Sequence, residues 1–219
     1  MKKIGMIGIG LMGHGIASNI VKHGYPLTVM EHAGNQPLDS LLAQGVKTVK
    51  TPRSLGAEAE IILLCVTGAP QVEAVLTGDD GLIAGLKAGT IVIDCSTVSK
   101  DTAIAAARHL STKGVHFFDA PVTGGVEGAR NGTLSIMLGG EEAILPEIAP
   151  LLATMSSRYT SMGPVGSGQA AKAVNQVMCA GINEAVTEAL AFGVGLGLDI
   201  ERVMDAIRGG AAGNWFLDK

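Results

Sequence analysis

The fold of this chain is decided by its first residues, Lys3-Ile4-Gly5-Met6-Ile7-Gly8-Ile9-Gly10-Leu11-Met12-Gly13. Residues 3–9 are typical of a buried strand, and residues 12–23 have the spacing of a helix. Between a strand and a helix, a Gly-x-Gly-x-x-Gly loop allows a tight turn at Gly8, approach of a phosphate to the backbone at Gly10, and close packing at Gly13. The loop therefore predicts a dinucleotide site formed by Gly8, Ile9, Gly10, Leu11, Met12 and Gly13. The alternative is a tight turn that binds nothing.

The rest of the chain repeats the alternation of strand and helix. Further strand patterns occur at residues 27–30, 61–66, 91–94, 115–119 and 134–138, and helical patterns at 38–44, 71–76, 102–113, 141–155, 168–196 and 199–208. Such alternation is typical of a parallel, doubly wound sheet. We therefore predict an α/β protein, with a Rossmann-type doubly wound domain at residues 1–166 and the start of an all-α domain at residues 167–219.

Composition excludes some classes of protein. The 219 residues are 47% apolar and 16% charged, with a net charge of −4 and no basic run, which excludes disorder and argues against a nucleic-acid partner. The three cysteines, Cys65, Cys95 and Cys179, lack metal-binding spacing, so no metal site is expected. Continuous apolar runs such as residues 61–66 are strand-sized, so no membrane partner is expected and a cytoplasmic location is predicted.

An acidic residue ends the second predicted strand. Glu31 follows residues 27–30 and lies where a carboxylate would accept hydrogen bonds from the adenine-ribose hydroxyls. A carboxylate there repels a 2′-phosphate, which favours NAD over NADP, although the neighbouring His32 could offset that repulsion. The alternative is a solvated glutamate at a strand end.

Four stretches together resemble the β-hydroxyacid dehydrogenase family, which includes 3-hydroxyisobutyrate dehydrogenases and tartronate semialdehyde reductases (2-hydroxy-3-oxopropionate reductases). They are the glycine loop, Asp94-Cys95-Ser96-Thr97, Asp119-Ala120-Pro121-Val122-Thr123-Gly124-Gly125, and Gly163-Pro164-Val165-Gly166-Ser167-Gly168-Gln169-Ala170-Ala171-Lys172. They follow the order and spacing of the family and cover almost the whole chain. The resemblance implies an oxidoreductase that uses NAD or NADP.

The resemblance also assigns binding residues. It places Cys65 and Val66, which end a predicted strand, against the dinucleotide, and Thr97 beside the nicotinamide. Ser96 and Thr97 could equally cap the helix that follows. The sequence Thr123-Gly124-Gly125 is expected to form a loop that offers a hydroxyl and backbone N–H groups to a substrate carboxylate. The family usually has serine where this chain has Thr123, so the added methyl group narrows the pocket.

Lys172 is the predicted catalytic residue. A lysine that is desolvated on a helix beside a glycine loop can transfer a proton near neutral pH, and the family assigns the matching lysine this acid–base role. The alternative is an ordinary surface lysine. Asn175 and Gln176 follow three and four residues later, on the same helix face, and are predicted to bind substrate.

These observations predict an NAD(P)-dependent enzyme that interconverts a small 3-hydroxy acid and its semialdehyde. The alternatives are a non-catalytic dinucleotide-binding or interaction module and an imine reductase. Family members continue past the position of Lys219, so we expect the helical domain here to be truncated. An apolar stripe at Val174, Met178 and Ile182 predicts docking between subunits, and the family resemblance implies a homo-oligomer, a dimer or tetramer.

Overall fold

The structure of the chain is a computed structural model that describes residues 1–218. The chain divides into two compact units, Met1–Lys172 and Ala173–Lys219, and the division falls inside one long helix. The sequence predicted the domain boundary a little earlier, between residues 166 and 167.

The first unit is built on one twisted sheet. Six of its strands are parallel and lie in the order β3-β2-β1-β4-β5-β6, which is the order of a Rossmann-type doubly wound fold. They are β1 (Ile4–Ile7), β2 (Leu27–Met30), β3 (Lys47–Val49), β4 (Ile61–Leu64), β5 (Ile91–Asp94) and β6 (His116–Asp119). Beyond β6 the sheet continues through β8 (Leu134–Gly139), which pairs antiparallel with β6 and with β7 (Val122–Thr123) and parallel with β9 (Ser156–Gly163).

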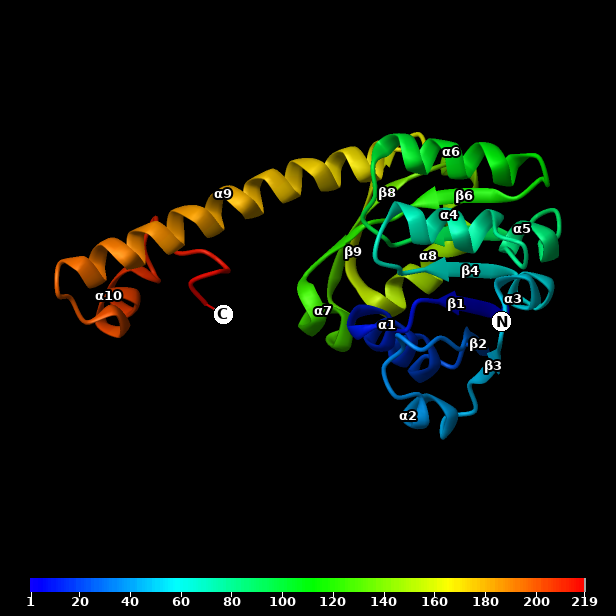
Figure 1. Ribbon diagram of the computed structural model, residues 1–219, viewed down its shortest axis with the longest axis horizontal. Coiled ribbons are helices and arrows are strands. Elements are labelled where there is room, and N and C mark those ends of the chain that lie inside the picture. Colours follow the sequence, from blue (N-terminus) through cyan, green and yellow to red (C-terminus); the bar gives the residue numbers. More distant parts are fainter. Residues whose placement is uncertain (219) are drawn as a thin grey trace. The chain divides into compact units, whose positions relative to one another are not determined.

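Helices cover both faces of this sheet (Figure 1). Successive residues of a strand point to opposite faces, so Ile61 and Leu63 join one core while Ile62 and Leu64 join the other. The first core contains residues from α1 (Leu11–Lys22), α2 (Asp39–Leu42), α7 (Gly125–Asn131) and α8 (Leu145–Met155), and the 3-10 turn η1 (Glu142–Ile144) packs against it. The second core contains residues from α3 (Pro52–Glu58), α4 (Ala69–Thr77), α5 (Leu82–Gly85) and α6 (Lys100–Ser111). The predicted fold class is confirmed.

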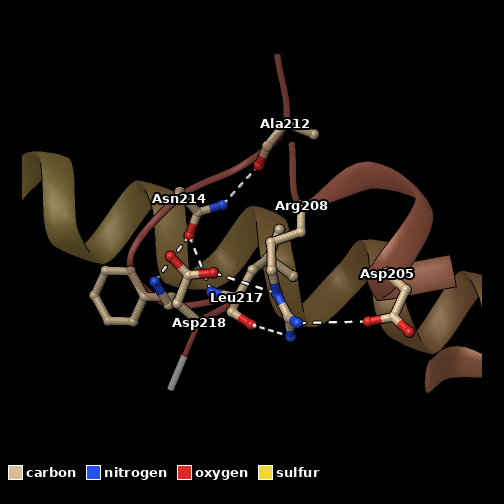
Figure 2. A network of polar contacts seen from close by, with 7 residues as sticks. Asp205, Arg208, Ala212, Asn214, Leu217 and Asp218 are labelled. Atoms are coloured by element: carbon tan, nitrogen blue, oxygen red, sulfur yellow. Dashed lines mark hydrogen bonds and ion pairs between the residues drawn. The ribbon is translucent and has the colours of Figure 1, made fainter. Parts of the chain in front are cut away.

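The second unit consists of most of α9 (Ser167–Gly195), α10 (Ile200–Ile207) and the segment that follows. The Asp199 side chain caps α10 by accepting hydrogen bonds from the N–H groups of Glu201 and Arg202. Figure 2 shows polar contacts that join residues 205–218. Arg208 reaches Asp205, Asp218 and the carbonyl of Leu217, and the Asn214 side chain donates to the carbonyl of Ala212 and accepts from the N–H groups of Phe216 and Leu217.

Helix α9 is unusually apolar for its length. By length and composition alone it could cross a membrane, with a mean hydropathy of 1.3 over its most apolar window, of which 6% is buried. One such helix is weak evidence, because core helices of soluble proteins have the same composition. The absence of a membrane partner therefore stays a prediction from sequence.

Several short elements differ from the sequence prediction. Strands β3, β7 and β9 and helices α3, α5 and α7 were not predicted. Residues 157–162 of β9 are exposed and mostly polar, so β9 lacks the alternation of apolar and polar residues that is typical of a half-buried strand. Helix α3 did have a signal, since Thr51 caps it and Pro52 is its first residue. Helix α8 contains Pro150 in its interior, although proline there removes a backbone hydrogen bond of the helix.

Candidate active site

The glycine loop lies at the carboxyl end of β1, next to the end of β4. Gly8 has a φ of +94°, and a Cβ atom there would lie 2.2 Å from the carbonyl oxygen of Cys65. A Cβ on Gly13 would lie 1.9 Å from the carbonyl oxygen of Gly8, whereas Gly10 faces open space. Within the described chain, no side chain caps the start of α1. The geometry therefore fits a pyrophosphate approaching Gly10 and the free N–H groups of α1.

A pocket adjoins this loop at the point where the strand order reverses. Its lining includes the predicted residues Gly8, Ile9, Gly10, Cys65 and Val66, together with Met30, His32, Asn35, Thr67 and Gln71. The sequence did not single out the last three. Asn35 donates to the carbonyl of Met30 at 3.0 Å, and the N–H of Gln36 donates to the carbonyl of Ile9 at 2.7 Å, so the loop after β2 folds onto the glycine loop. Open α/β sheets bind ligands at this position.

Glu31 directly follows β2 and lies beside the end of β3. Its N–H donates to the carbonyl of Val49, and its carboxylate forms an exposed ion pair with Lys50. Hydrogen bonds from Lys50 and Thr48 hold the pKa of Glu31 below its usual value. Glu31, His32 and Lys50 line a shallow surface pocket, which shares His32 and Asn35 with the pocket beside the glycine loop. A cation therefore adjoins the carboxylate that was expected to select NAD.

The thiol of Cys65 is not a candidate nucleophile. Burial raises its pKa to about 11, and the nearby Asp94 carboxylate raises it further. At neutral pH the thiol therefore stays protonated, and its contribution to the pocket is one of shape.

Two buried carboxyl groups end the neighbouring strands β5 and β6. Asp94 and Asp119 are register partners, and neither is exposed. Burial raises the pKa of Asp94 to about 6, although hydrogen bonds from Ser96 oppose the change and Asp119 adds to it. Its Oδ2 atom has no hydrogen-bond partner among the residues that the structure describes. Burial also raises the pKa of Asp119, against the opposing effect of N–H groups that donate to it.

The segment after β5 does not provide the cap of α6 that the sequence offered as an alternative. Ser96 and Thr97 do not cap α6, because Ser99 is its N-cap and accepts a hydrogen bond from the N–H of Thr102. The Ser96 hydroxyl instead accepts from the N–H of Val66 at 3.0 Å, which ties the ends of β4 and β5 together. The Thr97 side chain is left exposed at this edge of the sheet.

Lys172 lies in the second turn of α9 and is buried, with 8% of its surface exposed. Its Nζ atom donates a hydrogen bond to the carbonyl of Val122 at 2.8 Å. This contact places the ammonium group beside the residue that precedes Thr123. A lysine on an exposed surface, the alternative reading, does not agree with this burial.

Thr123 was expected in a loop, but it ends the short strand β7, and Gly125 begins α7. Gly124 and Gly125 have φ angles of +126° and +64°, are exposed, and carry no Cβ atom to cover the backbone. Pairing of Thr123 with Ser135 of β8 holds the threonine in place. The hydroxyl and the start of α7 therefore remain a feasible site for a carboxylate.

Asn175 and Gln176 follow Lys172 on α9 and belong to the second unit. The Asn175 amide donates to the Gln176 side chain at 3.0 Å and to the Cys179 sulfur at 3.4 Å. Their predicted role in substrate binding is not tested by these contacts and stays a prediction.

Comparison with known families agrees with the geometry of both units. Residues 3–163 match the NAD-binding domain of 6-phosphogluconate dehydrogenase, and residues 166–219 match a domain described as the NAD-binding domain of NADP-dependent 3-hydroxyisobutyrate dehydrogenase. The fold and the site thus define a nicotinamide-dinucleotide-dependent oxidoreductase.

Comparison with individual relatives shows which family of oxidoreductases the chain belongs to. The chain is 38% identical to 2-hydroxy-3-oxopropionate reductase of Escherichia coli and 34% identical to NAD-dependent L-serine dehydrogenase of Pseudomonas aeruginosa, covering 99% and 100% of this chain and 73% of each relative. The structure of Mycobacterium tuberculosis 3-hydroxyisobutyrate dehydrogenase with L-serine matches with a TM-score of 0.85 at 31% identity, covering 99% of this chain and 73% of that one. The chain belongs to the β-hydroxyacid dehydrogenase family.

Proposed function

We propose that this protein interconverts a small 3-hydroxy acid and its semialdehyde, in the manner of a 2-hydroxy-3-oxopropionate reductase or a 3-hydroxyisobutyrate dehydrogenase. The observation that carries the proposal is the buried Lys172, whose Nζ atom is held at the carbonyl of Val122, next to Thr123. A proton-transferring group thus adjoins a threonine–glycine segment suited to a carboxylate. Relatives that are named for these two activities and for L-serine oxidation support the substrate class.

Each residue has a distinct part in the proposed reaction. A nicotinamide dinucleotide, held at the glycine loop, would supply the hydride acceptor or donor. The Thr123 hydroxyl and the N–H groups at Gly124 and Gly125 bind the substrate carboxylate. Lys172 takes the proton from the substrate hydroxyl during oxidation and returns it to the carbonyl oxygen during reduction. Asn175 or Gln176 orients the reacting oxygen.

NAD is the proposed preferred cofactor, because a carboxylate at Glu31 hydrogen-bonds the ribose hydroxyls and repels a 2′-phosphate. The ion pair with Lys50 weakens that repulsion, so the expected preference over NADP is small. Comparing reaction rates with NADH and NADPH measures it directly. A cytoplasmic location and assembly into a homo-oligomer stay predictions from the sequence.

The test of the function is the absorbance of the reduced nicotinamide. Tartronate semialdehyde is offered with NADH or NADPH, and glycerate, 3-hydroxyisobutyrate and L-serine with each oxidised cofactor. The expected result is turnover of at least one pair. A chain that binds the dinucleotide but reduces or oxidises none of these compounds would instead support a binding module.

The decisive variant is Lys172→Ala. It should lower kcat by about 10²–10⁴-fold, the usual contribution of general acid–base catalysis, and leave the Kd of the dinucleotide nearly unchanged, because the glycine loop is untouched. Lys100→Ala, which removes an exposed lysine of α6, is the control. Unchanged turnover in the Lys172 variant would contradict the assigned role.

A further inference from the structure

Gln169, in the first turn of α9, contacts the backbone of the segment that follows β5. Its side chain is buried, with 2% exposed, and both ends of its amide are engaged. The Nε2 group donates to the carbonyl of Ser96 at 2.7 Å, and Oε1 accepts from the N–H of Val98 at 3.1 Å. The amide is therefore hydrogen-bonded to the backbone of the residue before Thr97 and of the residue after it.

The backbone of Gln169 is anchored as firmly as its side chain. Its N–H donates to Oδ2 of Asp119 at 2.8 Å, and the N–H of Gly166 donates to Oδ1 of the same carboxyl at 2.7 Å. Asp119 ends β6, so the first turn of α9 is fixed to the sheet. Hydrogen bonds to a carboxylate are stronger than those between neutral groups, which makes this a rigid attachment.

Lys172 follows Gln169 by three residues, which is about one turn of the helix. One residue thus connects the segment that carries Thr97 with the turn that carries Lys172. Hydride transfer and proton transfer have to take place at the same substrate carbon and oxygen, so the two segments must keep a fixed separation.

We propose that Gln169 is a positioning residue that holds the Thr97 segment and Lys172 in the relative placement required for hydride and proton transfer. The proposal rests on the proposed function. Gln169 acts through its neighbours and itself touches neither substrate nor dinucleotide. It carries no charge, so its part in the reaction is geometric.

Two substitutions separate the hydrogen bonds from the volume of the side chain. Gln169→Met fills nearly the same space but can neither donate to Ser96 nor accept from Val98 in the same way. Gln169→Glu, when its carboxyl group is ionised, keeps the acceptor for Val98 and loses the donor to Ser96. Gln44→Met is the matched control, because Gln44 is exposed and bonds only locally, to the carbonyl of Ser40.

The main readout is the split between kcat and cofactor binding. Both Gln169 variants should lower kcat by about 10–100-fold, the effect of a misplacement of about 1 Å, while the dinucleotide Kd changes by less than about 3-fold. Gln44→Met should change neither. Unchanged kcat in both variants overturns the proposal. Loss of both dinucleotide binding and cooperative unfolding in both variants also overturns it, since Gln169 would then be needed for folding in general.

A double-mutant cycle distinguishes positioning from a general structural role. If Gln169 acts through Thr97, the losses in kcat caused by Gln169→Met and Thr97→Ala should not multiply, because each disturbs the same segment. Fully independent losses would overturn the connection to Thr97.

Amide hydrogen exchange gives a readout that does not depend on activity. The Val98 amide should exchange at least about 10-fold faster in Gln169→Met than in the wild type, while amides of β1 keep their protection. If the wild-type protein turns over none of the substrates, the proposed function fails, yet exchange at Val98 still decides whether Gln169 holds this segment. Unchanged exchange there would overturn the proposal.

Discussion

The two units differ in how much of their apolar side chains is exposed to solvent. In the first unit, strand residues such as Ile62 and Leu63 have no exposed surface, because helices cover both faces of the sheet. In the second unit, Val177 and Phe192 are 74% and 69% exposed. Helical periodicity predicted α9 correctly, but a periodic apolar stripe identifies only the face of a helix that favours burial. It does not identify what covers that face.

Matched glycine substitutions give the largest expected contrast between the units. Gly13→Ala places a Cβ atom 1.9 Å from the carbonyl oxygen of Gly8, so it should destabilise the first unit by about 3 kcal/mol or more and abolish dinucleotide binding. Gly181→Ala meets nothing within 4 Å inside α9 and should stabilise that helix by about 0.5–1 kcal/mol, because alanine is the better helix former.

Urea denaturation measures both effects. Far-UV circular dichroism follows the sheet and its helices, and fluorescence of Trp215, the single tryptophan, follows the second unit. Equal losses of stability from Gly13→Ala and Gly181→Ala would contradict this expectation, because they would show that both glycines are packed equally tightly.

Asp94→Asn should have the next largest effect, through pH. The folded-state pKa of Asp94 is raised from 3.8 to about 6, so the folded protein binds more protons than the unfolded chain between these values. Stability from this group is therefore highest below pH 3.8 and falls as pH rises to about 6, by about 3 kcal/mol. In Asp94→Asn this fall should disappear.

The measurement is the free energy of unfolding at several pH values between 4 and 7, compared between wild type and variant. The difference between the two curves isolates Asp94 from the other carboxyl groups. Asp205→Asn, at an exposed carboxylate of the second unit, is the control for loss of one charge. An equal change in the control would show that burial is not the cause.

Arg208→Ala should have the smallest effect on the free energy of unfolding. Its ion pairs with Asp205 and Asp218 are exposed, and such pairs contribute about 0–1 kcal/mol (Figure 2). The expected change is local: amides of residues 214–218 should exchange faster with solvent, while the melting of the first unit is unaltered. A large drop in the melting temperature of the first unit would contradict the expectation that these ion pairs affect only residues 214–218.

Sequence patterns predicted the buried strands well because continuous apolar runs such as residues 61–64 are typical of strands covered on both faces. They did not predict β9, whose exposed polar residues are held in the sheet by pairing with β8. In the candidate site, Gly8 and Glu31 were predicted from their residue types and positions in the strand–helix pattern, whereas the predicted role of Lys172 rests mainly on the family resemblance, because an isolated lysine is usually a surface residue. Gln169 was not predicted, because its contacts with Ser96 and Val98 join segments far apart in the sequence.

The attachment of α9 to Asp119 has a consequence for the order in which the protein is made. The two bonded residues, Asp119 and Gln169, are 50 positions apart, and the dinucleotide edge is formed by β1, β2 and β4, which precede both. Chains emerge from the ribosome N-terminus first and begin to fold as they emerge. A nascent chain can therefore form the glycine-loop edge of its sheet well before Lys172 has been synthesised, and the first turn of α9 can attach to Asp119 only after both segments have emerged.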